Sequence, residues 1–151
     1  MSLAVPGGEL VVDAAYVDAP AEEIRRQARE YGAGTRESFD LPLRYPGGFL
    51  GRVMGAMAAI PYGETRTYGD LAADLDNAPQ PVGAACGRNP VPLLVPCHRV
   101  VAADGLGGFS ADGGPELKRR LLDHERSASV QTTLADAPTT DAGDPPADGE
   151  P

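Results

Sequence analysis

Apolar residues recur at helical spacing in two long segments of this chain. In residues 18–32, Ile24, Ala28 and Tyr31 fall on one face, acidic residues fill the first turn, and a glycine ends the pattern. In residues 49–60, apolar side chains repeat at the same spacing until a proline stops them. We predict a helix in each segment, and the second is the core helix.

The next segment predicts two short helices joined by a turn. Thr67, followed by Asp70 three residues later, is typical of a capping box and opens a helix whose leucines face inward. Residues 77–81 predict a turn, and a helix rich in glycine and alanine follows over 81–88, ending before a proline. Two short helices with a tight turn between them indicate a helix-turn-helix.

The remaining segments have weaker patterns. Residues 91–101 are apolar and punctuated by proline, which predicts an extended segment rather than a helix. A final helix over 115–125 buries its leucines. Residues 9–17 and 39–43 predict strands of a small N-terminal sheet, although their alternation is weak. Together these elements predict an α+β fold that is mainly helical in its second part.

The charge is acidic overall and unevenly spread. The 151 residues include 13 Lys plus Arg and 22 Asp plus Glu, which gives a formal charge of −9 and a pI of about 4.6. Residues 1–47 carry −3, residues 48–126 carry −1, and residues 127–151 carry −5 with no basic residue. We predict an N-terminal domain, a nearly neutral main domain and a disordered acidic tail that has little to bury.

Net acidity bears on partners and environment. It argues at first against nucleic acid, because binding to phosphates takes a basic face. The argument from charge does not apply to the nearly neutral main domain, which contains the predicted helix-turn-helix. Lys118 is the only lysine in the chain. Abundant acid with Arg in place of Lys leads to the hypothesis of a salt-adapted, halophile-like protein.

Patterns that are missing from the sequence bear on the cellular location of the protein and on whether it binds a metal ion. No apolar run is long enough to span a bilayer, and the N-terminus has no signal-peptide pattern. We expect a cytoplasmic protein that does not bind membranes. Cys86, Cys97 and the two histidines form neither a disulfide framework nor a zinc motif, so we expect no bound metal.

Candidate chemistry concentrates in residues 96–100, which contain Cys97 and His98. A cysteine reacts as the thiolate, and a nearby imidazole helps to form it. Adjacent side chains on an extended segment point to opposite sides, so we expect a water to carry the proton to His98. Glu125 is a candidate to orient the imidazole. A buried, inert cysteine is also compatible with this segment, and the local residues alone do not decide.

The wider pattern resembles a known family. Six separated blocks carry the resemblance: Pro61-Tyr62-Gly63-Glu64, Thr67-Tyr68-Gly69-Asp70-Leu71-Ala72, Val82-Gly83-Ala84-Ala85, Arg88-Asn89-Pro90-Val91-Pro92, Pro96-Cys97-His98-Arg99-Val100, and Lys118 with Leu121-Leu122-Asp123-His124-Glu125. In order and spacing they resemble the methylated-DNA-protein-cysteine methyltransferases, also called O6-alkylguanine-DNA alkyltransferases. The likeness covers about residues 48–125, and residues 30–43 resemble the end of the family's N-terminal domain.

The resemblance implies a fold and a reaction. The fold is a mainly helical catalytic domain over 48–126, with a winged-helix-like helix-turn-helix, after a shortened α/β N-terminal domain over 1–47. The family binds duplex DNA, turns the damaged guanine out of the stack and moves its alkyl group permanently onto a cysteine. The implied function is DNA repair in a single turnover, with O6-alkylguanine in double-stranded DNA as the partner and no cofactor. We expect a monomer.

The resemblance also implies catalytic roles. Cys97 is the nucleophile and alkyl acceptor, His98 the water-mediated base, and Glu125 its orienting partner. Asn89 resembles a hinge asparagine that ties down the active-site turn. Tyr68 resembles a tyrosine that crowds the DNA phosphate and donates a proton toward the departing guanine. Outside these family blocks, Asn89 would be interpreted as an ordinary residue at the end of a helix, and Tyr68 as a core or surface tyrosine.

The DNA face implied by the resemblance lies on the helix-turn-helix. Its small residues let the backbone approach the minor groove, although they also suit tight helix packing. Most members have an arginine that enters the base stack, whereas this chain has Gln80, which lacks a charge and a guanidinium plane. We therefore expect slower base flipping. The DNA-contacting candidates are Thr67, Tyr68, Gln80, Ala84, Ala85 and Arg88.

The substrate pocket implied by the resemblance follows the active-site segment. Many relatives have a tyrosine in place of Phe109, and residues 111–114 form a longer stretch than in many relatives. Both departures leave the placement of the pocket wall open. Lys118 also fits a solvated helix face. The pocket candidates are Val100, Phe109, Ser110 and Lys118.

Three other functions compete with the alkyltransferase reading. The main alternative is a non-catalytic alkyl-damage DNA-binding protein of the same fold, against which the presence of Cys97 argues. A DNA-binding regulator would leave the cysteine, histidine and glutamate without a purpose. A thiol hydrolase or redox protein would leave the helix-turn-helix without one.

Overall fold

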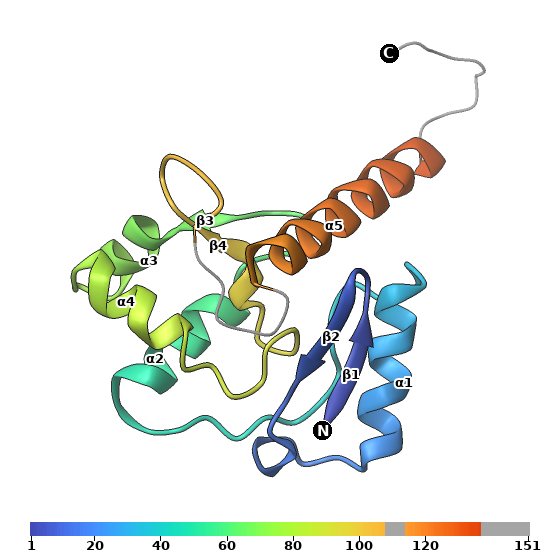
Figure 1. Cartoon of the computed structure of the whole chain (residues 1–151), viewed down its shortest axis with the longest axis horizontal. Helices are drawn as coiled ribbons and strands as arrows, with labels where there is room; N and C mark the ends of the chain where they lie inside the picture. The colour runs from blue at the N-terminus through green and yellow to red at the C-terminus, as the bar shows by residue number, and fades with distance from the viewer. Residues whose placement is uncertain (108–113, 137–151) are drawn as a thin grey trace.

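The computed structural model of the protein describes residues 1–107 and 114–136. Within these residues the chain forms helices and two small sheets, which confirms the α+β class (Figure 1). The elements in chain order are β1 (Ser2–Val5), β2 (Gly8–Val11), the 3-10 helix η1 (Ala14–Tyr16), α1 (Ala21–Gly32), α2 (Gly48–Ala58), β3 (Arg66–Thr67), α3 (Tyr68–Asp74), α4 (Pro79–Cys86), the 3-10 helix η2 (Cys97–Arg99), β4 (Val100–Val101) and α5 (Gly114–Asp136).

The N-terminal sheet differs from the prediction. β1 pairs antiparallel with β2 across a turn in which Gly7 has φ +95°, a conformation that glycine adopts without strain. Of the predicted strand 9–17, only the start belongs to β2, because Asp13 caps η1 by accepting a hydrogen bond from the Ala15 amide at 3.0 Å. The predicted strand 39–43 contributes a single bridge to Val17. Both strand predictions were therefore largely wrong.

The two long helices of the first half confirm the periodic pattern. α1 begins after Pro20 and buries Ile24, Ala28 and Tyr31 on the face that the spacing predicts. α2 buries its central apolar residues but ends at Ala58, before the predicted end at residue 60. In Figure 1, α1 lies beside the β1–β2 hairpin, whereas α2 lies on the side of the molecule that holds α3 and α4.

The helix-turn-helix pair is present as α3 and α4. Thr67 and Asp70 form the predicted capping box, with each side chain accepting a hydrogen bond at 3.0 Å from the other residue's amide. α4 begins at Pro79, two positions before the predicted start at residue 81, because proline is well suited to the first turn of a helix. Arg52 of α2 donates a hydrogen bond at 3.0 Å to the Leu75 carbonyl and so caps the end of α3.

The segment over 91–101 is more tightly turned than predicted. Cys97, His98 and Arg99 form the 3-10 turn η2 rather than an extended strand, and only Val100 and Val101 continue as β4. β4 pairs in parallel with β3, which directly precedes α3. This pairing holds the turn that contains Cys97 next to the start of the helix-turn-helix.

The last helix presents one buried stripe toward the rest of the protein. Leu117, Lys118, Leu121, Leu122 and Glu125 are buried and recur at helical spacing, so the helix period itself turns Glu125 inward. α5 continues past Glu125 to Asp136 and therefore runs into the segment 127–151 that the sequence predicts as a disordered tail. Residues 137–151 lie outside the described residues.

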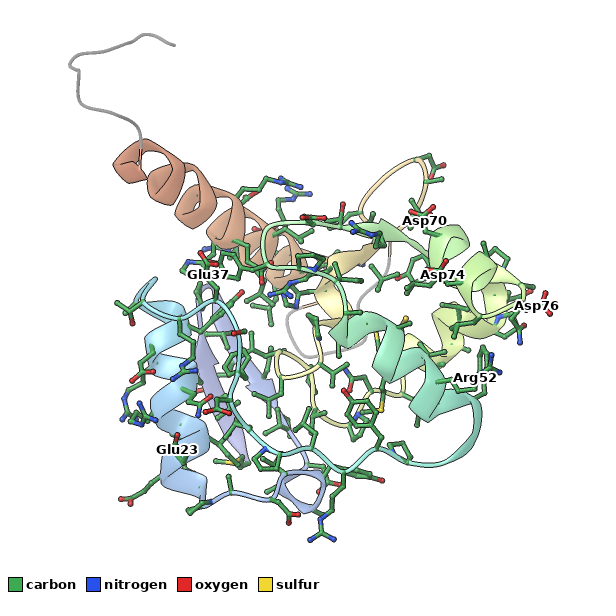
Figure 2. The ribbon with its side chains drawn as sticks, turned by 180° about the vertical axis from the view of Figure 1, so that it is seen from behind. Glu23, Glu37, Arg52, Asp70, Asp74 and Asp76 are labelled. Carbon is green, nitrogen blue, oxygen red and sulfur yellow. The ribbon has the colours of Figure 1, made fainter. Side chains whose placement is uncertain are left out.

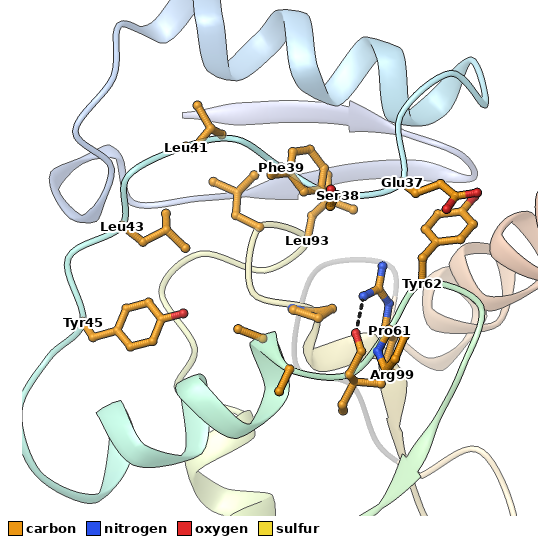
Figure 3. A pocket seen from close by; sticks show the side chains of 15 residues that line it. Glu37, Ser38, Phe39, Leu41, Leu43, Tyr45, Pro61, Tyr62, Leu93 and Arg99 are labelled. Carbon is orange, nitrogen blue, oxygen red and sulfur yellow. Dashed lines mark hydrogen bonds between the residues drawn. The ribbon is translucent and has the colours of Figure 1, made fainter.

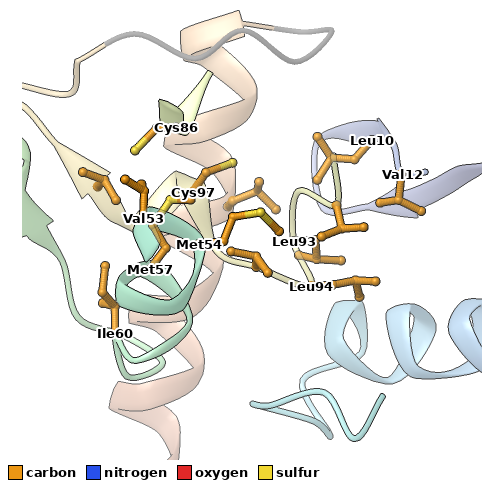
Figure 4. Packing of buried hydrophobic residues seen from close by; sticks show 14 of the residues in the cluster. Leu10, Val12, Val53, Met54, Met57, Ile60, Cys86, Leu93, Leu94 and Cys97 are labelled. Carbon is orange, nitrogen blue, oxygen red and sulfur yellow. The ribbon is translucent and has the colours of Figure 1, made fainter. Parts of the chain in front are cut away.

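One hydrophobic cluster joins the two halves of the described chain. Leu10 and Val12 of the N-terminal part and Met54 and Met57 of α2 belong to the same buried cluster as Cys97 (Figure 4). Leu93 and Leu94, from the loop before η2, lie between these two groups in Figure 4. Within residues 1–107 and 114–136, no helix combines the length and apolar character needed to cross a membrane.

Candidate active site

Cys97 begins the η2 turn and is 8% exposed. Its backbone amide donates a hydrogen bond to the Val95 carbonyl at 2.8 Å. The same carbonyl accepts a hydrogen bond from Asn89 Nδ2 at 2.9 Å, while Asn89 Oδ1 accepts one from the Val91 amide at 3.1 Å. The Asn89 side chain therefore bridges the residues that follow α4 to the turn that carries Cys97.

His98 and Glu125 meet inside the protein. His98 Nε2 lies 2.6 Å from Glu125 Oε2, and the side chains of both residues are 1% exposed. The other ring nitrogen, Nδ1, is buried and has no hydrogen-bond partner among the residues that the structure describes. A carboxylate on one ring nitrogen fixes the tautomer in which the opposite nitrogen carries a lone pair.

Glu125 accepts hydrogen bonds from four residues. Arg99 donates from Nε to Oε1 at 2.9 Å and from Nη2 to Oε2 at 3.1 Å. The Tyr31 hydroxyl donates to Oε2 at 2.7 Å, and the Gly63 amide donates to Oε1 at 3.3 Å. With His98 included, both oxygens of the buried carboxylate are satisfied, as a buried charge requires.

The charge states of this network follow from its contacts. Burial opposes ionisation of Glu125, but the hydrogen bonds and charges of His98 and Arg99 outweigh it and lower its pKa to about 2. Burial lowers the pKa of His98 below its usual value, against the opposing pull of Glu125. Near neutral pH, Glu125 is ionised and His98 is a neutral imidazole able to accept a proton.

Cys97 is held as a thiol in the resting protein. Burial raises the pKa of the Cys97 thiol, although the Asn89 side chain and the charge of Lys118 act in the opposite direction. A cysteine with a raised pKa reacts only when a base removes its proton. The neutral His98 beside it in the η2 turn is a base of the right kind.

Tyr68 and Lys118 lie together near the cysteine. Lys118 is fully buried, and its Nζ lies 5.7 Å from the centre of the Tyr68 ring. Burial lowers the pKa of Lys118, whereas the nearby thiols raise it. Gly107 packs against Tyr68 so closely that a Cβ there would lie 3.1 Å from the ring. The alternative of a solvated helix face for Lys118 is therefore excluded, because its side chain is enclosed.

Part of the predicted DNA face is accessible in the structure. Gln80, Ala84 and Arg88 are exposed on or just after α4. Ala85 is 0% exposed and belongs to the hydrophobic cluster, so its side chain does not belong to that face, and its prediction as a DNA contact is corrected. Thr67 is half-buried, and its hydroxyl is used in the capping box of α3.

The predicted pocket is only partly within the described chain. Val100 is 0% exposed, backbone included, so its place in a substrate pocket stays a prediction. Phe109 and Ser110 lie outside the described residues. His, Cys, Asp and Glu side chains within residues 1–107 and 114–136 form no group of three or more suited to hold a metal ion.

A cavity of about 730 Å³ lies beside this network (Figure 3). Phe39, Leu41 and Tyr45 line one side of it, and Tyr62 and Arg99 line another. Neither Cys97 nor His98 is among its lining residues. Of the active-site network, the cavity therefore reaches only the arginine.

Sequence reasoning missed two side chains of the network, those of Arg99 and Tyr31. Arg99 is a lone charge in an apolar segment, a signal that it would be buried and paired. Tyr31 was predicted on the buried face of α1, but nothing in the sequence indicated that its hydroxyl would reach Glu125, 94 positions away.

The fold and the site together define a DNA-binding enzyme that carries its own cysteine nucleophile. Residues 48–127 match the family model described as the DNA binding domain of 6-O-methylguanine DNA methyltransferase. The chain belongs to the family of methylated-DNA-protein-cysteine methyltransferases, which confirms the resemblance read from its sequence blocks.

Relatives in sequence and structure agree with this assignment. The inducible methylated-DNA-protein-cysteine methyltransferase of Bacillus subtilis (strain 168) is 43% identical over 130 residues, which cover 83% of this chain and 69% of that protein. The crystal structure of Mycobacterium tuberculosis O6-methylguanine methyltransferase is 42% identical with a TM-score of 0.67, covering 76% of this chain and 72% of that one. The M. tuberculosis protein in complex with DNA is 33% identical with a TM-score of 0.71, covering 84% and 92%.

Proposed function

We infer that this protein repairs O6-alkylguanine in double-stranded DNA by moving the alkyl group onto Cys97 in a single turnover. The observation that carries the inference is the buried Cys97 turn, in which the next residue, His98, is held by Glu125 at 2.6 Å. This turn is joined to the helix-turn-helix through the β3–β4 pairing. Nucleophile, base, orienting carboxylate and a DNA-binding element thus belong to one site.

The reaction needs one displacement and two proton transfers, one from the Cys97 thiol and one from the Tyr68 hydroxyl. The Cys97 thiol gives its proton, through a water, to Nδ1 of His98, and Glu125 stabilises the imidazolium that forms. The thiolate sulfur attacks the alkyl carbon, forming a C–S bond while the bond from carbon to O6 of guanine breaks. The electron pair of that bond remains on the guanine, toward which the Tyr68 hydroxyl donates a proton. The reaction uses no cofactor, because the DNA supplies the alkyl group and the protein accepts it.

The role of the helix-turn-helix is to present the damaged base. We place α4, with the exposed Ala84, in the minor groove in the manner of a winged-helix protein. Turning a base out of the stack costs a few kcal/mol, and Gln80 is placed to fill the gap that it leaves. Arg88, exposed just after α4, is suited to a phosphate contact. The protein acts as a monomer, since one chain holds every group that the reaction uses.

Transfer is tested by mixing the protein with a duplex that contains one O6-methylguanine. We expect unmodified guanine in the DNA, in an amount that saturates at one equivalent per protein molecule. The Cys97→Ala variant is the control and should bind the duplex without repairing it. Binding without repair by the natural sequence would overturn the inference in favour of a non-catalytic damage-binding protein.

A further inference from the structure

Tyr31 reaches the catalytic network from another part of the chain. It belongs to α1, outside residues 48–127 that match the family model. Its side chain is fully buried, and its hydroxyl donates a hydrogen bond to Glu125 Oε2 at 2.7 Å. The carboxylate that holds His98 is therefore also held by a residue of the N-terminal part.

Contacts on its other sides fix the position of the Tyr31 ring. His124 Nε2 lies 2.8 Å from the Tyr31 carbonyl, and the two rings are 5.0 Å apart. The ring stacks on Phe39 at 5.8 Å and meets the edge of Tyr62 at 6.1 Å. With its ring enclosed in this way, the hydroxyl is directed at Glu125.

The oxygen that Tyr31 contacts is the one that faces His98. Glu125 Oε2 accepts the hydroxyl at 2.7 Å and lies 2.6 Å from His98 Nε2. A hydroxyl donor on this oxygen holds the carboxylate in place and takes up part of its negative charge. It therefore limits how strongly Glu125 holds a proton on the imidazole.

We propose that Tyr31 is a positioning residue for the alkyl transfer, which acts through Glu125 on His98. The inference rests on the proposed function, because it assigns Tyr31 to that reaction. It makes the N-terminal part a contributor to the chemistry. Other titratable or charged groups near the pair are Arg99 and Cys97 from η2, Lys118 and His124 from α5, and Tyr62 from the segment before β3.

The Tyr31→Phe variant tests the proposal, because it keeps the ring and removes only the hydroxyl. The measurement is the single-turnover rate on a duplex containing O6-methylguanine, as a function of pH. Only neutral His98 accepts the proton, so the rate falls as the pH drops through the ionisation of His98. Without the hydroxyl, Glu125 favours the charged imidazole more strongly. We expect the midpoint of the acid limb to rise by about half a unit to one unit, which lowers the rate on that limb about threefold to tenfold.

Tyr62→Phe is the matched control. The Tyr62 hydroxyl is buried in the same aromatic group, but it has no hydrogen-bond partner within the described part of the chain. Its removal should leave the midpoint where the natural sequence has it. A purely structural role for Tyr31 would lower the stability or the rate at every pH without moving the midpoint, and that result would overturn the proposal.

A second substitution keeps the test valid if Tyr31→Phe does not fold. A 3-fluorotyrosine placed at position 31 retains the hydroxyl and makes it a stronger donor. We expect it to move the midpoint in the opposite direction, to lower pH. An unchanged midpoint with active protein would overturn the role of Tyr31 alone, whereas a natural protein that transfers no methyl group would overturn the proposed function itself.

Discussion

Glu125 is the residue on which most of the active-site contacts converge. Its carboxylate is 1% exposed and lies between an imidazole and a guanidinium. Burying a carboxylate is costly, and removing its charge leaves Arg99 buried without a counter-ion, a change that typically costs about 3–5 kcal/mol. The charge of Glu125 should therefore affect the free energy of unfolding as well as the rate of alkyl transfer.

We predict that Glu125→Gln lowers the free energy of unfolding by about 3 kcal/mol at pH 7 and by much less at pH 3. The pKa of Glu125 is lowered from 4.5 in the unfolded chain to about 2 in the folded one. Its stabilising contribution is therefore complete above pH 4.5 and is lost as the pH falls toward 2. Urea unfolding at the two pH values measures the difference between the variant and the natural sequence.

Glu116→Gln provides the control for this prediction. Glu116 lies on the same helix, and its side chain is 60% exposed beside Arg120. An exposed pair of this kind contributes about 0–1 kcal/mol. The Glu125 account would fail if both variants lost equal stability, or if the loss at Glu125 did not shrink in acid.

Some residue contacts were predictable from the sequence and others were not. His98 and Glu125 were predicted as partners, and the structure places them 2.6 Å apart. The predicted hydrogen bonding of the Asn89 side chain to the active-site turn is also present, with the Val95 carbonyl as acceptor. The sequence left open whether Lys118 is buried and did not indicate the contact from Tyr31 to Glu125, because both depend on which helices meet in three dimensions. Helical periodicity shows on which face of its own helix a residue lies, but it does not show which residue of another element that face contacts.

At the scale of elements, the loop from Asn89 to Cys97 depends on one side chain. We predict that Asn89→Ala lowers the free energy of unfolding by about 1–3 kcal/mol and slows transfer, because the Val95 carbonyl and the Val91 amide each lose a partner. Asn89→Asp keeps the acceptor for Val91 but turns a carboxylate oxygen toward the Val95 carbonyl, so it should also destabilise the protein and slow transfer. Denaturant unfolding measures both, and equal stability in all three proteins would contradict the prediction.

The helix α4 carries a prediction about base flipping. Gln80 is exposed near its N-terminus, where an arginine would add a charge and a planar stacking group. We predict that Gln80→Arg raises the single-turnover rate on duplex DNA about several-fold, since each 1.4 kcal/mol of added stabilisation is tenfold in rate.

Free O6-methylguanine base is the control substrate for Gln80→Arg. Its reaction requires no flipping, so its rate should stay the same in the variant. An unchanged rate on the duplex would show that Gln80 already fills the stack as well as arginine does.

Elements were predictable where local sequence determines them. The capping box at Thr67 and the apolar faces of α1 and α2 specify helices without any distant contact. The strands were predicted poorly, because β1 and β2 are short and their pairing decides them more than their composition does. The η2 turn was missed because a side-chain hydrogen bond from Asn89 and a backbone hydrogen bond from Cys97 close it on the Val95 carbonyl, and the pattern of apolar residues does not reveal such bonds.

For the whole molecule, the distribution of charge is the main feature that the active site does not explain. The formal charge is −9, and Asp70, Asp74 and Asp76 lie on or just after α3, at the helix-turn-helix (Figure 2). Like charges on one surface repel one another and destabilise the folded state. At physiological ionic strength, salt largely screens the repulsion between charges more than about 8 Å apart, and higher salt screens closer ones.

We predict that molar potassium chloride raises the midpoint of thermal unfolding, because it screens this repulsion.

We also predict modest affinity for undamaged duplex DNA, with a weak dependence on salt, since few basic residues are available to displace counter-ions. Thermal scans and fluorescence anisotropy across a salt series measure the two effects. A midpoint that falls with salt would contradict the salt-adapted hypothesis.

The most direct test of the account is the position of the methyl group after reaction with O6-methylguanine duplex DNA. Cys86 is an internal comparison, because burial raises the pKa of its thiol to about 12 and, unlike Cys97, it is not followed by a histidine. Mass spectrometry of the digested protein should find one added methyl group on the peptide that contains Cys97 and none on Cys86. A methyl group on another residue, or an unmodified Cys97 after the DNA has been repaired, would contradict the account.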